Sequence, residues 1–172
     1  MKNLTLLIPA KYESESLPKV LEEIKGYDCE VIIVLESSDT KTINVAKNYD
    51  CKILYQSKKG YGNALIEGMN NVQTEYLCIF NADGSFDPKY LKQMLVACQN
   101  NLDFIFASRY MNNAGSDDAS FVSTLQMCIC VSPLCVCACI LACVQACVCV
   151  CVRWSHEKYL PWQKWRSLLV PH

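Results

Sequence analysis

The stretch Leu4-Thr5-Leu6-Leu7-Ile8, which ends at Pro9, decides the fold of this chain. It is a short and nearly continuous apolar run, which is typical of a β-strand buried on both faces. An amphipathic helix is predicted next, because apolar residues recur at helical spacing in Leu17, Val20, Leu21 and Ile24. Ser16 is placed to cap this helix, and Pro18 suits its first turn.

The same alternation of strand and helix continues to residue 107. Further strands are predicted at residues 30–35, 51–55, 76–80 and 102–107. Helices are predicted at residues 40–49, at residues 62–72 despite Gly68, and after Asp87 and Pro88, which suit an N-cap and a first helical position. This order favours an α/β fold, in which a mostly parallel, Rossmann-like sheet is the middle of three layers.

The composition divides the chain into three segments. The 172 residues carry 16 basic and 17 acidic side chains, and this balance gives no electrostatic footprint for nucleic acid. We interpret residues 1–119 as one domain, residues 120–152 as an uncharged Cys/Val-rich segment, and residues 153–172 as a basic and aromatic tail.

Histidine is absent from residues 1–119. This absence excludes a Ser-His-Asp triad, a Cys-His pair and a His-ligated zinc from that segment. The apolar run that begins at Leu4 is too short for a signal peptide, so we expect a cytoplasmic domain. Its cysteines are then most simply reduced core residues, namely Cys29, Cys51, Cys78 and Cys98.

Polar residues follow each predicted strand. Because the carboxyl ends of parallel strands meet at one edge of a sheet, we expect these side chains to form a ligand site. Carboxylates, lysines, a glycine turn and an arginine suit a nucleoside diphosphate with Mg²⁺ or Mn²⁺, since hard cations take oxygen ligands and substrate phosphates. In chain order these residues are Pro9, Tyr12, Glu13, Glu36, Asp39, Lys58, Lys59, Gly60, Gly62, Asn81, Asp83 and Arg109.

Each of these features also has a purely structural interpretation. Residues 58–62 suit a solvated turn, and Asp83 suits the start of a turn before a helix. Tyr12 and Glu13 suit an exposed surface, and Arg109 suits an ion pair with Asp103. Their occurrence in order, at the ends of successive strands, favours the functional interpretation.

The motifs at these strand ends resemble those of family 2 glycosyltransferases, in particular the polyprenyl-phosphate, dolichol-phosphate mannosyltransferase-like branch. The resemblance covers roughly residues 3–118 and implies the nucleotide-sugar-binding fold called GT-A, in a chain truncated after its donor-binding half. Residues 8–13 and 34–39 are similar to motifs that hold the base and ribose. Residues 58–64 are similar to the glycine turn, residues 81–85 to the D-x-D motif, and residues 107–110 to the strand-end arginine.

Two motifs depart from the family pattern. Asn81 replaces the first aspartate of D-x-D, which leaves Asp83 as the main metal carboxylate, and Leu35-Glu36 replaces an Asp-Asp pair. The resemblance also implies that Arg109 steadies a phosphate of the donor or acceptor. Asp117 and Asp118 are expected near the acceptor.

The resemblance implies a metal-dependent hexosyltransferase that moves a sugar from a GDP- or UDP-sugar to a lipid phosphate or a glycan, with inversion. A lipid phosphate is already anionic and needs no strong general base, which agrees with the absence of histidine. A nucleotide-sugar-binding chain without turnover is an alternative, because Asn81 carries no charge. A nucleotidyltransferase is disfavoured, because the segment after the first predicted strand, residues 9–13, lacks the glycines of a phosphate loop.

No charged side chain occurs in residues 119–152. This segment is long enough to cross a bilayer, which needs about 20 apolar residues, and the tail suits a membrane interface. Association with the cytoplasmic face of a membrane is therefore one hypothesis. Alternating Cys and Val also suits an out-of-frame end encoded by a TG-dinucleotide repeat, and Cys-x-Cys spacing suits a thiolate metal or redox module.

Overall fold

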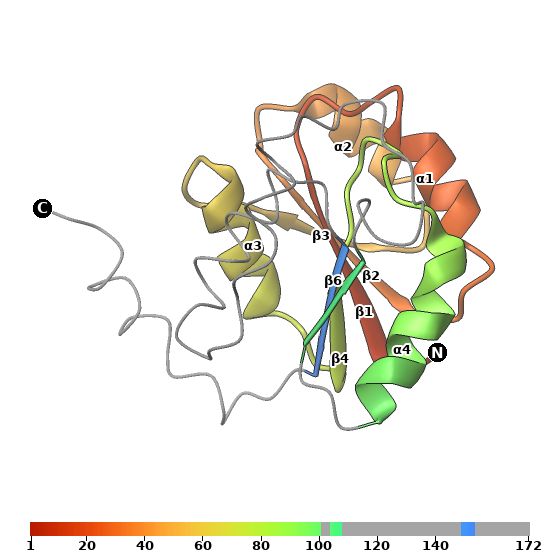
Figure 1. Ribbon diagram of the computed structural model, residues 1–172. Coiled ribbons are helices and arrows are strands. Elements are labelled where there is room, and N and C mark those ends of the chain that lie inside the picture. Colours follow the sequence, from red (N-terminus) through yellow and green to blue (C-terminus); the bar gives the residue numbers. More distant parts are fainter. Residues whose placement is uncertain (101–103, 108–148, 154–172) are drawn as a thin grey trace, which may run out of the picture.

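A six-stranded sheet forms the centre of the computed structural model, which describes residues 1–100, 104–107 and 149–153 (Figure 1). The strand order is β3-β2-β1-β4-β6-β5. β1 pairs in parallel with β2 and with β4, and β2 pairs in parallel with β3, which confirms the predicted α/β class. The strands are β1 (Leu4–Ala10), β2 (Glu30–Leu35), β3 (Lys52–Tyr55), β4 (Tyr76–Ile79), β5 (Phe104–Ala107) and β6 (Cys149–Arg153).

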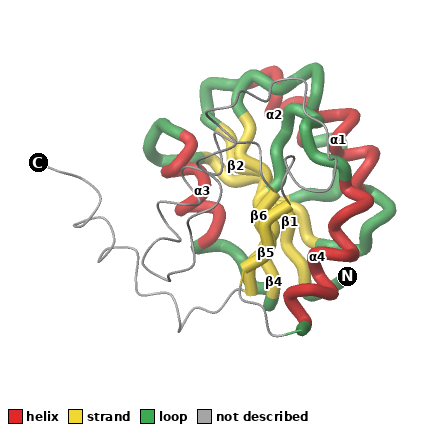
Figure 2. The backbone as a smooth tube through the Cα atoms, in the orientation of Figure 1, coloured by secondary structure: helices red, strands yellow, loops and turns green. Residues whose placement is uncertain are grey.

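Helices cover both faces of the sheet and give the three predicted layers (Figure 2). One face is covered by α1 (Leu17–Ile24), α2 (Thr40–Ala46) and α4 (Leu91–Gln99), and the other by α3 (Tyr61–Met69). A short 3-10 helix, η1 (Pro88–Tyr90), leads into α4. Each face therefore has its own apolar core.

β1 is the strand on which both cores depend. All of its residues are buried, and Leu7 lies opposite Ile32 of β2 and Ile79 of β4. Because side chains alternate along a strand, Leu6 and Ile8 pack with α1, α2 and α4, whereas Leu7 packs with α3. Burying one such side chain stabilises a fold by roughly 1.5–3 kcal/mol.

β6 is a strand that the sequence analysis above does not predict. It lies between β4 and β5 and is antiparallel to both, so β5 itself runs in the same direction as β4. A segment without charge predicts a membrane span or a low-complexity end, but valine also favours strands, and an uncharged run suits a strand in mid-sheet. Composition does not separate these cases.

Within the three ranges that the structure describes, no helix has the length and apolar character needed to cross a membrane. Residues 120–148 and 154–172 lie outside those ranges. The hypotheses of a membrane segment, an out-of-frame end and a Cys-rich module therefore remain hypotheses.

The helix starts differ in part from those predicted. Ser16 does not cap α1 with its side chain, because its hydroxyl donates instead to Oε2 of Glu13 at 2.5 Å. Asp87 does cap its helix: its Oδ1 accepts the main-chain N–H of Lys89 at 3.0 Å, although the first turn is 3-10 rather than α. α2 and α3 end earlier than predicted, at Ala46 and Met69.

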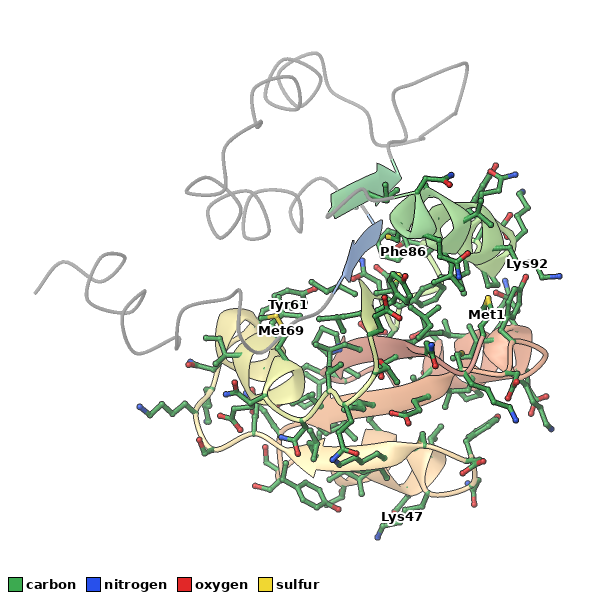
Figure 3. All side chains as sticks on the ribbon, turned by 90° about the horizontal axis from the view of Figure 1, so that it is seen from below. Met1, Lys47, Tyr61, Met69, Phe86 and Lys92 are labelled. Carbon is green, nitrogen blue, oxygen red and sulfur yellow. The ribbon has the colours of Figure 1, made fainter. Side chains whose placement is uncertain are left out.

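α3 approaches the sheet closely at Gly68. Tyr61 and Met69, at the two ends of this helix, pack against the apolar core that contains Leu7 (Figure 3). A Cβ atom added to Gly68 would lie 2.2 Å from Cδ1 of Leu7, which is closer than real Cβ contacts allow. An added Cβ would therefore force the buried Leu7 side chain to move, so packing favours glycine at this position despite its low helix propensity.

We expect Gly68→Ala to lower the free energy of unfolding by about 1–3 kcal/mol, because the steric conflict with buried Leu7 outweighs the gain in helix propensity. Urea unfolding followed by circular dichroism measures this change. Gly26→Ala is the matched control, because no atom lies within 4 Å of the added Cβ. Equal stability of the two variants would contradict the packing role of Gly68.

Candidate functional site

The loops that follow β1, β2, β3 and β4 lie at one edge of the sheet, because these strands are parallel. Pro9 is the first predicted site residue and lies within β1, opposite Val34. Arg109, Asp117 and Asp118 lie outside the described residues.

Asp39 joins the loop after β1 to the start of α2. Its Oδ2 accepts the main-chain N–H of Tyr12 at 2.7 Å, and its Oδ1 accepts that of Thr42 at 3.2 Å. Burial raises the pKa of Asp39, but the hydrogen bonds from Thr42 and Tyr12 outweigh it and hold the pKa below its usual value. Tyr12 has a φ of +60° and keeps 71% of its surface exposed. Asp39 therefore fixes an unusual backbone conformation that presents the Tyr12 ring to solvent.

Glu36 and Lys11 form an ion pair at the same edge. Nζ of Lys11 lies 2.8 Å from Oε1 of Glu36 and 5.5 Å from the ring centroid of Tyr12. The hydrogen bond from Lys11 is the main cause that lowers the pKa of Glu36; burial opposes it, and the charge of Lys59 adds to it. The same bond raises the pKa of Lys11. Both groups are therefore charged at neutral pH.

The loop after β3 is held by Glu67 of α3, a residue that the sequence analysis does not identify. The Glu67 carboxylate accepts the main-chain N–H of Ser57 at 2.8 Å and its hydroxyl at 2.8 Å. Lys58 and Lys59 are exposed, and Gly60, at φ +110°, precedes the first turn of α3, which contains Gly62. The contact spans ten positions of sequence, and no local pattern marks it.

The loop after β4 is a tight turn at Asp83. Its Oδ1 accepts the main-chain N–H of Ser85 at 2.8 Å, and Gly84 adopts a φ of +77°. Nδ2 of Asn81 donates to Oγ of Ser85 at 3.3 Å. The rings of Phe80 and Phe86 pack edge to face, with their centroids 5.5 Å apart, and hold the two ends of the turn together. Asp83 therefore starts a turn through Oδ1, whereas its Oδ2 accepts no hydrogen bond from any described residue.

The chemistry of this turn fits a cation that is only partly held by protein. The Asp83 carboxylate and the Asn81 amide can each supply an oxygen, which is the ligand type that Mg²⁺ and Mn²⁺ prefer. Within the described ranges, no group of three or more His, Cys, Asp or Glu side chains could hold a metal ion. Ligand phosphates would have to complete the coordination.

The described loops meet only in part. The first three are connected through Tyr12, Asp39, Glu36, Lys11 and the charge of Lys59. Between residues 1 and 100, no hydrogen bond or ion pair joins the Asp83 turn to the Lys11–Glu36 pair. A hollow of about 410 Å³ lies beside that turn, lined by Glu23 and residues 84–88.

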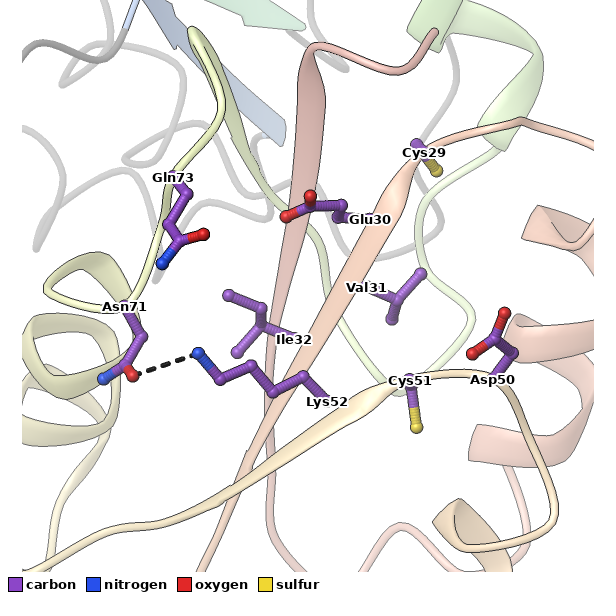
Figure 4. Close-up of a pocket in the computed structure, with 9 residues that line it drawn as sticks. All are labelled: Cys29, Glu30, Val31, Ile32, Asp50, Cys51, Lys52, Asn71 and Gln73. Carbon is purple, nitrogen blue, oxygen red and sulfur yellow. Dashed lines mark hydrogen bonds between the residues drawn. The ribbon is translucent and has the colours of Figure 1, made fainter.

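A second hollow, of about 390 Å³, lies at the opposite edge of the sheet (Figure 4). It is lined at the amino ends of β2 and β3, where Nζ of Lys52 donates to Oδ1 of Asn71 at 3.2 Å. Burial raises the pKa of the Cys29 thiol there to about 11, and raises that of Cys51 as well. Cys29 and Cys51 form no disulfide and are protonated at neutral pH. The sequence predicts them in the core, but they are only partly buried, whereas Cys78 and Cys98 are buried as predicted.

Comparison with known proteins gives a family and a fold. The model of the family described as "Glycosyl transferase family 2" matches residues 5–143. Uncharacterized glycosyltransferases of Mycobacterium tuberculosis (strain H37Rv) and Mycobacterium bovis are each 29% identical over 107 residues, covering 62% of this chain and 48% of the relative. The chain therefore spans about half the length of the curated relatives it matches.

Solved structures of other proteins share the fold. Glucosyl-3-phosphoglycerate synthase from Mycobacterium tuberculosis, in complex with Mn²⁺, uridine-diphosphate and glucosyl-3-phosphoglycerate, has a TM-score of 0.61 at 13% identity, covering 88% of this chain and 57% of that one. A cytidylyltransferase from Leptospira borgpetersenii has a TM-score of 0.53 at 16% identity, covering 65% and 56%. At these identities the likeness concerns the fold, which is of the GT-A type expected from the sequence.

We expect Asp39→Asn to destabilise the protein by about 1–2 kcal/mol at neutral pH, because an amide offers only one acceptor to the N–H groups of Tyr12 and Thr42. The pKa of Asp39 is lowered from about 3.8, so its contribution is fully present above that value and is lost as the pH falls through the lower folded pKa. Urea unfolding at several pH values measures the difference. A difference that persists undiminished at the most acidic pH would contradict the assignment to the carboxylate.

Proposed function

The chain belongs to glycosyl transferase family 2, and from this we propose that it transfers a sugar from a nucleoside-diphosphate sugar to an acceptor. The main support for the proposal is the set of side chains in the loops at one edge of the sheet. These loops contain the exposed ring of Tyr12, the Lys11–Glu36 ion pair and two exposed lysines. These groups match the base and the phosphates of such a donor.

We propose that the base lies against Tyr12 and is selected by the Lys11–Glu36 pair. A carboxylate accepts from a ring N–H, and an ammonium donates to the neighbouring carbonyl oxygen. Guanine and uracil both present an N–H beside a carbonyl, whereas adenine and cytosine present a bare ring nitrogen there. The pair at 2.8 Å therefore favours a GDP- or UDP-sugar. In this proposal Glu13 and Asp39 hold the loops rather than contact the base. Glu13 accepts the hydroxyl of Ser16, and Asp39 accepts the main-chain N–H groups of Tyr12 and Thr42.

We propose that Lys58 and Lys59 bind the phosphates, and that Asp83 and Asn81 supply oxygen ligands to Mg²⁺ or Mn²⁺. The ion would neutralise charge on the departing nucleoside diphosphate. The N–H of Ser85 holds Oδ1 of Asp83 and so leaves Oδ2 as the available ligand. Gly60, at a φ of +110°, lets the loop turn into α3, and Gly62 leaves the first turn of that helix without a side chain.

We propose a lipid phosphate or a glycan as the acceptor, with Arg109, Asp117 and Asp118 near it. We also propose that the part of the uncharged segment that precedes β6, residues 120–148, lies at the cytoplasmic face of a membrane. A phosphate acceptor would attack the anomeric carbon as an anion, displace the nucleoside diphosphate and invert the configuration at that carbon. This step needs no histidine, and residues 1–119 contain none.

A second candidate is a protein that binds the nucleotide sugar without transferring it. Asn81 favours this candidate, because it brings no charge to the metal where the family motif has an aspartate. Release of the nucleoside diphosphate in the presence of acceptor separates the two: the enzyme releases it continuously, and the binding protein does not.

We expect Asp83→Asn to abolish the Mn²⁺-dependent part of donor binding while it leaves the fold intact, because the amide keeps an acceptor for the N–H of Ser85 and loses the charge. Calorimetric titration with GDP-mannose and UDP-glucose, with Mn²⁺ and then with EDTA, measures the binding. Asp50→Asn is the matched control, since Asp50 lines the hollow at the opposite edge.

Three outcomes decide the donor assignment. Metal-dependent binding that is lost in Asp83→Asn and kept in Asp50→Asn supports the site and identifies the base. Binding that EDTA and Asp83→Asn leave unchanged would remove the metal from the proposal. A folded wild-type chain that binds neither donor would exclude the donor site altogether.

A further inference from the structure

We propose that Glu67 is a positioning residue that holds the loop of residues 57–59 in the conformation that binds the donor phosphates. This inference deepens the proposed function and rests on it. Glu67 lies on α3, one residue before Gly68, and reaches back to the loop that precedes its own helix. It belongs to none of the motifs that suggest the family.

The Glu67 carboxylate binds the loop at several points. Ser57 donates its main-chain N–H to Oε1 at 3.0 Å and to Oε2 at 2.8 Å, and its hydroxyl to Oε1 at 2.8 Å. The N–H of Lys58 approaches Oε1 at 3.4 Å. One side chain thus accepts donors from two consecutive residues.

The carbonyl groups of the same loop are held as well. Nε2 of Gln56 donates to the carbonyl of Lys58 at 2.9 Å, and Nδ2 of Asn63 donates to that of Lys59 at 2.8 Å. The main chain from Ser57 to Lys59 is therefore fixed on both sides, whereas the side chains of Lys58 and Lys59 stay exposed. A fixed backbone with exposed cations is what a preformed phosphate site requires.

The contact is made by the ionised form of Glu67. Partial burial raises its pKa, but the hydrogen bonds from Ser57 and Lys58 and the charge of Lys58 outweigh that effect and lower it. A glutamine at this position keeps the shape of the side chain and one acceptor oxygen, but it replaces the other oxygen with an NH₂ group that cannot accept an N–H, and it removes the charge. Glu67→Gln therefore weakens the loop contact with little change in packing.

The consequence for the donor is a lower entropic cost of binding. A loop that is already ordered loses less freedom when phosphate binds, so Glu67 acts on donor affinity rather than on the chemical step. Without the contact, the Lys58 and Lys59 peptide bonds become more available to a protease, since cleavage requires the local chain to open.

The test compares wild type with Glu67→Gln in the full chain. Limited trypsin digestion at Lys58 and Lys59, followed by mass spectrometry, measures loop opening, and we expect about five- to tenfold faster cleavage in the variant. Titration with GDP-mannose and UDP-glucose in the presence of Mn²⁺ measures affinity, which we expect to fall by about three- to tenfold, with kcat unchanged wherever turnover is detected. Glu22→Gln on α1 is the matched control, because Glu22 is an exposed carboxylate whose ion pair is with Lys25.

The outcomes distinguish the role of Glu67 from the proposed function on which it rests. Faster cleavage with weaker donor binding, at an unchanged unfolding midpoint, supports the positioning role. If the wild type binds the donor, and Glu67→Gln is cleaved at the same rate or binds the donor with the same affinity, the role of Glu67 is overturned and the proposed function stands. A wild type that binds neither donor overturns both, and a lowered unfolding midpoint without selective cleavage assigns Glu67 to fold stability and overturns its positioning role.

Discussion

The burial of β1 on both faces is the constraint on which the rest of the structure depends. A strand between two apolar cores can satisfy its main-chain N–H and C=O groups only through its neighbours, and β1 does so in parallel with β2 and β4. Parallel pairing requires a crossover connection between successive strands, and α1, α2 and α3 supply these crossovers here. It also brings the carboxyl ends of β1, β2, β3 and β4 to one edge, and the candidate site lies there because of that pairing.

Carboxylates shape the loops at this edge by accepting main-chain N–H groups. Asp39 holds Tyr12 and Thr42, Glu67 holds Ser57 and Lys58, and Asp83 holds Ser85. Loop N–H groups have no strand partner, and an ionised oxygen is a strong acceptor for them. An acidic residue at a strand end is therefore not evidence of catalysis by itself, because both oxygens of Asp39 are already engaged by the main chain.

Much of the fold could be predicted from the sequence because its signals are local. The apolar run at β1 and the helical spacing of Leu17, Val20, Leu21 and Ile24 are patterns within a few residues, and the structure confirms them. β6 was not predictable in this way, because its place between β4 and β5 depends on pairing with segments far away in the chain. The Lys11–Glu36 pair and the Glu67 contact could not be predicted for the same reason, because each joins residues on different elements and no spacing rule applies to them.

The carboxylates at this edge differ in how far other groups already engage them, and this difference affects how a cation and a donor would bind. Asp83 keeps one oxygen free of described partners, Asn81 adds a neutral oxygen, and Glu36 is neutralised by Lys11. A single carboxylate charge attracts a divalent cation weakly, whereas the diphosphate of a bound donor would add negative charge around the cation. Under the proposed function, affinity for the cation and affinity for the donor would be coupled, and by thermodynamic linkage each would strengthen the other equally. Asn81 in place of an aspartate would therefore favour a metal that binds together with its diphosphate, and it would not by itself remove the metal from the proposed chemistry.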